Sequence, residues 1–487
     1  MELVLVLLYS LCLLLILAYS FVQLNLLINY VRHRRAGGPS KAVLPEEWPE
    51  VTVQLPVYNE LYVVERLLEA VSQLDYPSEK LEVQVLDDST DESVGVTQAK
   101  VEELQARGLN IQYIHRTHRI GYKAGALKEG MEVAKGDFLA IFDADFIPGP
   151  DFLKKTIPHF GDQCVGVVQT RWAHLNRNYS WLTRVQAFAL DAHFTVEQVG
   201  RNAGNHFINF NGTAGVWRKA CIEDAGNWQS DTITEDLDLS YRSQIKGWKF
   251  KYLEDVETPA ELPVLISAAR SQQFRWNKGG AENFQKIKGQ LLSRKTAPLK
   301  TRIHALFHLL NSSMFMNVLL VSVLSIPMLY IKFFSPQYHL FFTLSSIVLI
   351  STLIFMGMYW VAYRRIHGGG FRSFLHYLRE FIIFYSIILG FSLQNSVAVL
   401  EGHLGKKSGF IRTPKFNVLS VKDSWKGNKY VQRQLSWVNW VEGLLMLYFG
   451  FGVVSAFMLH DYGLLPFHLM LFFGFGFVFY KSVTCRA

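Results

Sequence analysis

Acidic side chains stand at the ends of two stretches of sequence that have the pattern of buried strands. Asp87 and Asp88 follow the run LEVQVL, and Asp143 and Asp145 lie in the run FLAIFDAD. An i, i+2 spacing on a strand places both carboxylates of the second pair on one side of it. Such carboxylates are costly unless they meet water, a cation or a hydroxylated ligand. The two pairs predict a polar ligand site with a hard cation, Mg²⁺ or Mn²⁺, held by carboxylates and ligand phosphates. The alternative is that each pair caps the helix that follows.

Two further segments combine side chains that could act on such a ligand. Residues 234–236 (TED) begin an amphipathic helical pattern, which Thr as helix cap and acids in the first turn would also explain. In the motif QQFRW, Gln272 and Arg275 share a helix face, and Arg can bind phosphate oxygens bidentately. Trp276 suits stacking on a sugar ring or anchoring at lipid headgroups.

Several common sites are absent from the sequence. The first predicted strand–helix turn carries LPVYNE, and no GxGxxG or GxxxxGK[ST] occurs there. This argues against a dinucleotide oxidoreductase and a P-loop ATPase, and leaves phosphate neutralisation to a cation and to basic side chains such as Lys123. None of the four cysteines forms a CxxC or CxxH pair, so no zinc site is predicted and the thiols are expected to be reduced.

The elements that must position these residues alternate between strand and helix patterns from residue 51 to residue 145. Strand patterns occur in VTVQLPVY, LEVQVLDD, NIQYIHR and DFLAIFDAD, with amphipathic helical patterns between them. Short connections in such an alternation predict a parallel, doubly wound α/β sheet with helices on both faces. The ligand site of such a sheet lies at the carboxyl ends of its strands.

Long apolar segments flank this region. Residues 3–31 are uncharged and exceed the roughly 20 residues needed to cross a bilayer. The run is too long for a signal peptide, and no small-residue cleavage site follows it. The basic cluster at 32–35 predicts that the N-terminus lies outside and residue 32 onward inside. Further crossings are predicted at about 307–331, 339–363, 436–459 and 463–481.

Residues 375–400 are apolar enough to cross, but basic residues flank both ends. The positive-inside rule therefore favours an interfacial or re-entrant segment and five crossings in total. The predicted units are a transmembrane helix at 1–35, a cytosolic domain at 36–262, interfacial helices with QQFRW at 263–303, and a C-terminal transmembrane region at 304–487 that contains a loop at 405–420.

The net charge of +8 does not indicate nucleic acid, because Lys and Arg cluster beside the apolar runs, where anionic lipid headgroups attract them. We therefore expect a multi-pass integral membrane protein that binds a lipid bilayer and no nucleic acid, with its α/β domain on the cytosolic face of a plasma, inner or Golgi-type membrane.

A series of motifs resembles those of the processive family 2 glycosyltransferases of the cellulose synthase superfamily. In order, they are LPVYNE, DDSTDES, GYKAGALKEGM, FDADF, FNGTAGVWR, TEDLDLSYR, QQFRW and FIRTPK. The likeness covers residues 51 to about 481 and is greatest to the cellulose-synthase-like A and C groups, which are glucomannan 4-β-mannosyltransferase-like, and to their bacterial relatives. It implies a GT-A type, Rossmann-like domain that polymerises a β-linked mannan, glucomannan or glucan with inversion, coupled to export.

The resemblance also implies partners and roles for individual residues. The donor would be GDP-mannose or UDP-glucose, and the acceptor the growing polysaccharide. Asp236 would be the general base and Asp145 the ligand of Mg²⁺ or Mn²⁺. Nucleotide-sugar binding would fall to Asp87, Asp88, Lys123, Asp143, Gln272 and Arg275. Acceptor binding would fall to Asn211, Gly212, Thr213 and Trp276.

Two features refine this interpretation. Cellulose synthases usually have Cys-Gly-Ser where this chain has residues 211–213 (Asn-Gly-Thr), which matches the mannan-type branch better. Residues 410–415 (FIRTPK) resemble a gating loop that closes over the nucleotide, and we expect no in-chain cyclic-di-GMP-binding domain after residue 481.

The alternatives are a non-processive enzyme that glycosylates a lipid, and a transporter or receptor that only binds sugar nucleotides. QQFRW and FIRTPK favour the polysaccharide synthase.

Overall fold

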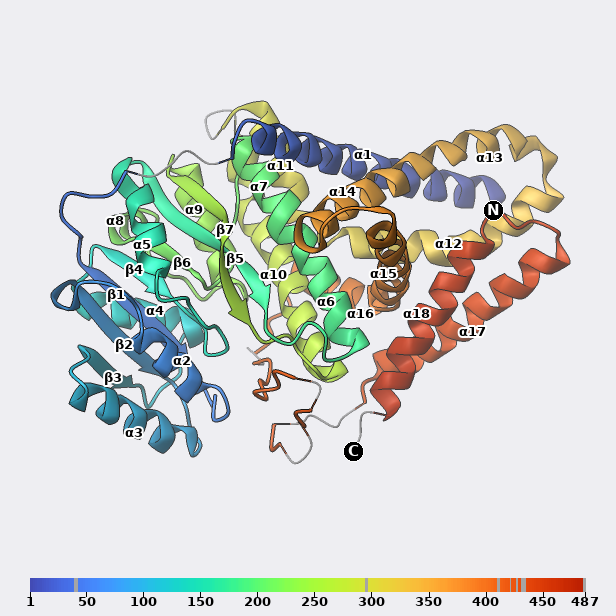
Figure 1. The fold of residues 1–487 in the computed structure, drawn as a ribbon. Helices are drawn as coiled ribbons and strands as arrows, with labels where there is room; N and C mark the ends of the chain where they lie inside the picture. The colour runs from blue at the N-terminus through green and yellow to red at the C-terminus, as the bar shows by residue number, and fades with distance from the viewer. Residues whose placement is uncertain are drawn as a thin grey trace.

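The computed structural model describes residues 1–38, 43–293, 297–409, 412–420, 422–425, 428–430 and 435–484. A domain built on one β-sheet lies at one end of the molecule, and long helices extend from it toward the other end (Figure 1). Residues 410 and 411 of the predicted gating loop, and Cys485, lie outside the described residues.

Seven strands form the sheet, in the order β3-β2-β1-β4-β6-β5-β7. The first four pair in parallel, as the strand–helix alternation predicts, but β6 runs antiparallel to both β4 and β5. The sheet is therefore mixed, because the chain re-enters it in the opposite direction after a helical excursion. The strands are β1 (Val51–Val57), β2 (Leu81–Asp87), β3 (Ile111–His115), β4 (Phe138–Ile141), β5 (Val165–His174), β6 (Gly215–Arg218) and β7 (Lys249–Ala260).

The period-two pattern of β1 explains how the sheet is covered on both faces. Its valine and leucine side chains pack on one face against α2 (Val64–Ser72) and α3 (Ser93–Ala106). Its polar side chains point to the other face, where Thr52 donates to Glu82 of β2 at 2.7 Å and Gln54 donates to Gln84 at 3.1 Å. These pairs satisfy buried polar groups that would otherwise destabilise the core.

The second face of the sheet is continuous with the long apolar helices. One buried cluster joins α4 (Tyr122–Val133), α8 (Lys219–Asp224) and α9 (Glu235–Ile245) with Tyr30 of α1 and Met358 of α14. The remaining helices beside the sheet are α5 (Phe152–Thr156), α6 (Trp181–Ala192), α7 (Gln198–Ala203), α10 (Ile266–Leu292) and α11 (Leu299–Leu309). The sheet domain therefore shares a core with the helical region.

One prediction about the sheet is wrong. Strand β4 ends at Ile141, so Asp143 and Asp145 lie in the turn that follows it and not on a strand face. The turn forms because the backbone N–H of Phe146 donates to the carbonyl of Asp143 at 3.0 Å. As a result the two carboxylates differ in exposure, 37% for the Asp143 side chain and 8% for Asp145.

Among the described residues, six helical segments are long and apolar enough to span a membrane, which supports an integral membrane protein. Residues 310–313 form a turn that separates α11 from α12, so the predicted span at 307–331 begins seven residues later. The six segments are α1 (Glu2–Arg35), α12 (Met314–Phe334), α13 (His339–Ser345) together with α14 (Leu349–His367), α15 (Phe371–Gly390), α17 (Trp437–Met458) and α18 (Leu465–Thr484).

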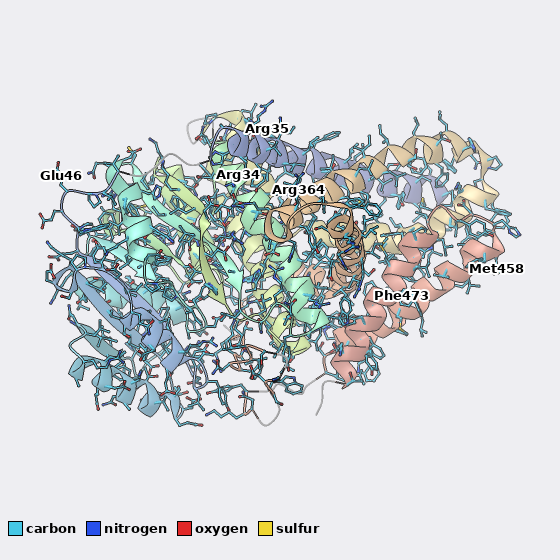
Figure 2. The ribbon with its side chains drawn as sticks, viewed as in Figure 1. Arg34, Arg35, Glu46, Arg364, Met458 and Phe473 are labelled. Carbon is cyan, nitrogen blue, oxygen red and sulfur yellow. The ribbon has the colours of Figure 1, made fainter. Side chains whose placement is uncertain are left out.

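Basic residues gather where the apolar helices meet the sheet domain. Figure 2 shows Arg34, Arg35 and Arg364 at this junction, with Met458 and Phe473 on the helices farther away. Arg34 lies 3.3 Å from the carboxylate of Glu254 on β7. The basic clusters at 32–35 and 364–365, which we assigned to lipid headgroups, therefore also bind α1 and α14 to strand β7.

The segment that we predict to be interfacial forms two helices, α15 and α16 (Ser392–His403). Helix α15 has a mean hydropathy of 1.2, the lowest of the six candidate spans, and runs across the direction of α1, α12 and α14 in Figure 1. Before it, Arg365 contacts Asp255 at 2.5 Å; after it, the Lys415 ammonium contacts Asp145 at 2.6 Å. Both flanks thus touch the sheet domain, although α15 is itself long and apolar enough to span a membrane, and five crossings remain a prediction.

Cysteine labelling in sealed vesicles tests the five-crossing prediction. We expect His367→Cys and Lys406→Cys, on either side of α15 and α16, to react with an impermeant maleimide from the same side of the membrane. The exposed native Cys164 of the sheet domain is the internal reference for that side. Labelling of Lys406→Cys from the opposite side would establish that the segment crosses the bilayer.

Candidate active site

An open cleft lies at the carboxyl ends of β1, β2 and β4, where an α/β sheet places its ligand. Its volume is about 1310 Å³ with the open mouth included, and α9, α10 and residues 412–415 form its other side. Of the twelve residues predicted from the sequence, only Asp87 and Thr213 are not part of its wall. The ten that line it are Asp88, Lys123, Asp143, Asp145, Asn211, Gly212, Asp236, Gln272, Arg275 and Trp276.

The first acidic pair is fixed by the protein's own donors. Asp87 ends β2, is fully buried, and accepts hydrogen bonds from the Tyr113 hydroxyl and the Ser89 N–H, both at 2.8 Å. Asp88 receives two hydrogen bonds of 2.6 Å from Arg116. Such a bidentate guanidinium–carboxylate pair fixes orientation as well as charge. Asp88 thus faces the cleft in one defined position, whereas Asp87 supports the strand end behind it.

Asp143 belongs to a short polar chain on the floor of the cleft. The Lys123 ammonium lies 2.5 Å from Asp143 and donates to the carbonyl of Gly212 at 2.8 Å. Although burial opposes its charged form, the carboxylates of Asp143 and Glu235 hold the pKa of Lys123 above its ordinary value. Thr213 acts from outside the wall, because its hydroxyl accepts the N–H of Asp143 at 2.8 Å. The turn after β4, the loop before β6 and the start of α9 therefore together hold one fixed positive charge.

Asp145 faces a different cation. Its carboxylate accepts a hydrogen bond of 2.6 Å from Lys415, so this position already binds a positive charge in the structure. The described residues contain no cluster of three or more His, Cys, Asp or Glu side chains that could hold a metal ion. The protein can therefore offer one or two carboxylates, which suits Mg²⁺ or Mn²⁺ bound jointly with diphosphate oxygens.

Asp236 stands in the first turn of α9, half-buried in the wall of the cleft. The N–H of Leu237 donates to its carboxylate at 2.8 Å. Burial, followed by repulsion from the neighbouring Glu235, nevertheless raises the pKa of Asp236 to about 7. Thr234 does not cap this helix with its side chain and instead accepts a hydrogen bond from Asn283 at 2.9 Å. A carboxylate with a raised pKa in a cleft is a candidate general base.

Helix α10 presents one face of QQFRW to the cleft, as the i, i+3 spacing predicts. Gln272 and Arg275 both line the wall, and Trp276 beside them is 38% exposed. Burial lowers the pKa of Arg275 to about 10, while Glu235 and Asp143 oppose the shift, so the guanidinium stays charged. Arg275 also donates to the Thr413 hydroxyl at 2.9 Å.

Asn211 offers a polar group toward the site. Its side-chain oxygen accepts hydrogen bonds from Gln198 at 3.2 Å and from Asn209 at 2.6 Å. Its buried side-chain nitrogen has no hydrogen-bond partner within the described part of the chain. A ligand hydroxyl would satisfy this donor, which is otherwise costly to bury.

Sequence reasoning missed two acids of the wall. Glu60, the last residue of LPVYNE, lies 2.8 Å from Arg412, and burial raises the pKa of its carboxyl to about 7. Glu261 follows β7 directly and is 3% exposed. The rule that identified Asp88, an acid at the carboxyl end of a strand, would also have identified Glu261.

Comparisons with known proteins agree with this architecture. Residues 49–279 match the family described as "Glycosyltransferase like family 2". Glucomannan 4-beta-mannosyltransferase 1 of Oryza sativa subsp. japonica is 44% identical over 268 residues, which cover 54% of this chain and 51% of that protein. Glucomannan 4-beta-mannosyltransferase 2 of Arabidopsis thaliana is 42% identical over 265 residues, 53% of this chain and 50% of that protein. The chain spans about half the length of these curated relatives.

A solved structure shares the fold. The mannosyltransferase PcManGT from Pyrobaculum calidifontis, determined in complex with GDP-Man and Mn²⁺, superposes with a TM-score of 0.52 at 22% identity, over 73% of this chain and 97% of that one. At this identity the likeness concerns the fold, which is of the GT-A type. Together with the sequence matches, it shows that the chain carries, over residues 49–279, the domain of the family 2 glycosyltransferases.

Proposed function

We propose that the protein is a membrane-bound, inverting hexosyltransferase that extends a β-linked mannan or glucomannan from a nucleotide sugar. The observation that carries this proposal is Asp236, whose carboxyl has a pKa of about 7 and shares a cleft with Lys123, Asp143 and Arg275. A base therefore faces a set of side chains suited to a sugar diphosphate. The names of the relatives support mannose as the transferred sugar.

The donor would lie along the floor of the cleft. Lys123 and Arg275 are both charged and line it, so they can offset the negative charge that grows on the departing diphosphate. Asp143 and Asp145 would hold Mg²⁺ or Mn²⁺ together with the diphosphate oxygens, and the ion would supply further positive charge there. Asp88, held by Arg116, would orient the nucleoside at the carboxyl end of β2.

Asp236 would act on the acceptor. Its carboxylate takes the proton from the acceptor hydroxyl as the oxygen bonds to the anomeric carbon, while the bond from that carbon to the diphosphate breaks. Attack opposite the leaving group inverts the α-linked donor into a β-linked product. A single carboxylate suffices as base, unlike the two carboxylates of most glycoside hydrolases.

The position of α10 supports a polymeric acceptor that continues toward the membrane. One face of α10 lines the cleft through Gln272, Arg275 and Trp276. On another face, Arg270 donates two hydrogen bonds of 2.9 Å to Glu442 of the apolar helix α17. Acceptor binding at Trp276 would thus take place beside the membrane helices. We propose processive synthesis coupled to export, with the sheet domain on the cytosolic side, where the basic clusters at 32–35 and 364–365 lie.

A nucleotide-release assay tests the donor and the product together. We expect the purified full-length protein in lipid nanodiscs, supplied with Mn²⁺ and a β-mannan oligosaccharide, to release GDP from GDP-mannose faster than UDP from UDP-glucose. The product should be a ladder of several added sugars. Preference for UDP-glucose would replace mannan by glucan, and a product limited to singly glycosylated lipid would favour the non-processive alternative.

Replacing the base tests the assignment of Asp236. We expect Asp236→Asn to lower kcat by roughly 10²–10⁴-fold while GDP-mannose binding is retained, because the amide cannot accept the proton. Asp224→Asn is the matched control, since Asp224 is an exposed acid that pairs with Lys246 on the surface. Retention of kcat in Asp236→Asn would refute the assignment; loss of activity in the control would indicate a general defect.

The raised pKa of Asp236 gives a pH dependence with a defined sign. The carboxyl is protonated below a pKa of about 7 and cannot act as base, so kcat/KM should fall roughly tenfold per pH unit as pH decreases from 7. Above that pKa the profile should level off. The residual activity of Asp236→Asn should lack this acid limb. An acid limb centred near pH 4 in the wild type would contradict the interpretation.

A further inference from the structure

Residues 412–417, which we call the cleft strap, are held against the cleft from several directions. Arg412 lies 2.8 Å from Glu60, and the Thr413 hydroxyl accepts a hydrogen bond of 2.9 Å from Arg275. The Lys415 ammonium donates to Asp145 at 2.6 Å. The side chains at 413, 415 and 416 are buried, although the strap has no regular secondary structure. Something other than secondary structure must therefore hold its backbone.

Glu261 supplies that support. Its two carboxylate oxygens accept the backbone N–H groups of Phe416 at 2.9 Å and Asn417 at 3.0 Å. Its own carbonyl accepts a hydrogen bond of 2.9 Å from Lys415. The residue that follows β7 thus holds three consecutive residues of the strap, all of them through charge-assisted hydrogen bonds.

The backbone conformation at Asn417 favours the contact between the strap and the Glu261 carboxylate. Asn417 has a φ of 56°, in the left-handed region, where successive N–H groups can converge on one anion. Arg66 approaches from the other side, with Nη2 3.7 Å from Glu261, and donates to the side chain of Asn417. Phe416 packs in a small apolar cluster with Val264 and Leu265, which begin just beyond Glu261.

Burial makes the arrangement sensitive to whether the strap is in place. Glu261 is 3% exposed, and a buried carboxylate needs its hydrogen bonds to stay charged at low cost. Departure of the strap would remove both backbone donors and the positive charge of Lys415 from its surroundings. The carboxylate therefore stabilises one position of the strap over others.

We infer that Glu261 is a positioning residue that seats the strap and so sets Lys415 and Thr413 in the wall of the cleft. Its effect on ligand binding rests on the proposed function. The seated strap places the positive charges of Arg412 and Lys415 in the wall that would face a nucleoside diphosphate. Seating by Glu261 thus encloses the nucleotide and slows its departure.

Limited trypsin digestion of the full-length protein in nanodiscs tests the seating directly. The bond after Lys415 is protected while that side chain is buried. We expect Glu261→Gln, which keeps the size of the side chain but removes its charge, to release the fragment that begins at Phe416 roughly tenfold faster, the usual effect of losing a charged hydrogen bond. Glu261→Asp should recover part of the protection. Unchanged cleavage in Glu261→Gln would overturn the inference.

Two further variants separate seating from misfolding. Glu257→Gln is the matched control, because Glu257 lies on the same strand, has a side chain 54% exposed and pairs with Arg171, and its cleavage should match wild type. Asn417→Val leaves Glu261 intact but disfavours the left-handed conformation, and it should expose the same bond. Protection of this bond in Asn417→Val would count against the inference.

Nucleotide affinity provides the second readout. With GDP and Mn²⁺ as the probe, we expect the Kd to rise roughly tenfold in Glu261→Gln and to stay unchanged in Glu257→Gln. Faster cleavage with unaltered GDP affinity would overturn the claim that the strap encloses the nucleotide. Digestion requires no catalysis, so a chain without transferase activity would refute the proposed function and still allow the seating to be measured.

Discussion

Carboxylates that line a cleft and are partly shielded from water must be compensated by positive charge, and this requirement organises the whole site. Asp88 is paired with Arg116, Asp143 with Lys123, Asp145 with Lys415, and Glu60 with Arg412. The four cations come from three regions of the chain: the loop before α4, the start of α4 and the strap. Breaking a buried pair by removing one partner typically costs about 3–5 kcal/mol, so the buried pairs of Asp88 and Asp145 constrain where their segments can lie. At Asp236, burial and repulsion from Glu235 outweigh the attraction of Lys123, and they raise the pKa of this carboxyl to about 7.

Local sequence patterns predicted the parts of the structure that depend on local physics. The four parallel strands followed from the alternation of strand and helix patterns, and the cleft face of α10 followed from helical spacing. The antiparallel insertion of β6 and the turn that carries Asp143 depend on contacts between distant residues, which a local pattern does not encode. Glu261 was missed although it too follows a strand, because its strand, β7, lies beyond the alternating region. Ten of the predicted residues line one cleft.

A buried acid that is paired with basic side chains also joins the sheet to the apolar helices. Glu254 is 5% exposed and accepts hydrogen bonds from Tyr30 at 3.0 Å and Arg34 at 3.3 Å, both on α1, and from Arg365 on α14 at 3.3 Å. Two apolar helices far apart in sequence are thus fastened to one strand through a single acid. Since Glu261 follows β7 directly, one strand connects this junction with the position that holds the strap. The cleft and the membrane helices therefore share one structural support.

The pairing of Asp145 with Lys415 has a consequence for biosynthesis. The two residues are 270 positions apart, so the acidic half of the cleft is made long before its partner emerges from the ribosome. At typical elongation rates of 5–20 residues per second, the delay is roughly 15 to 50 seconds. During that interval most of the apolar helices must already be inserting into the lipid, while several carboxylates of the cleft still face water. The pairing of Asp145 with Lys415 can form only after most of the apolar helices have been synthesised. Completion of the cleft is therefore linked to insertion of these helices into the bilayer.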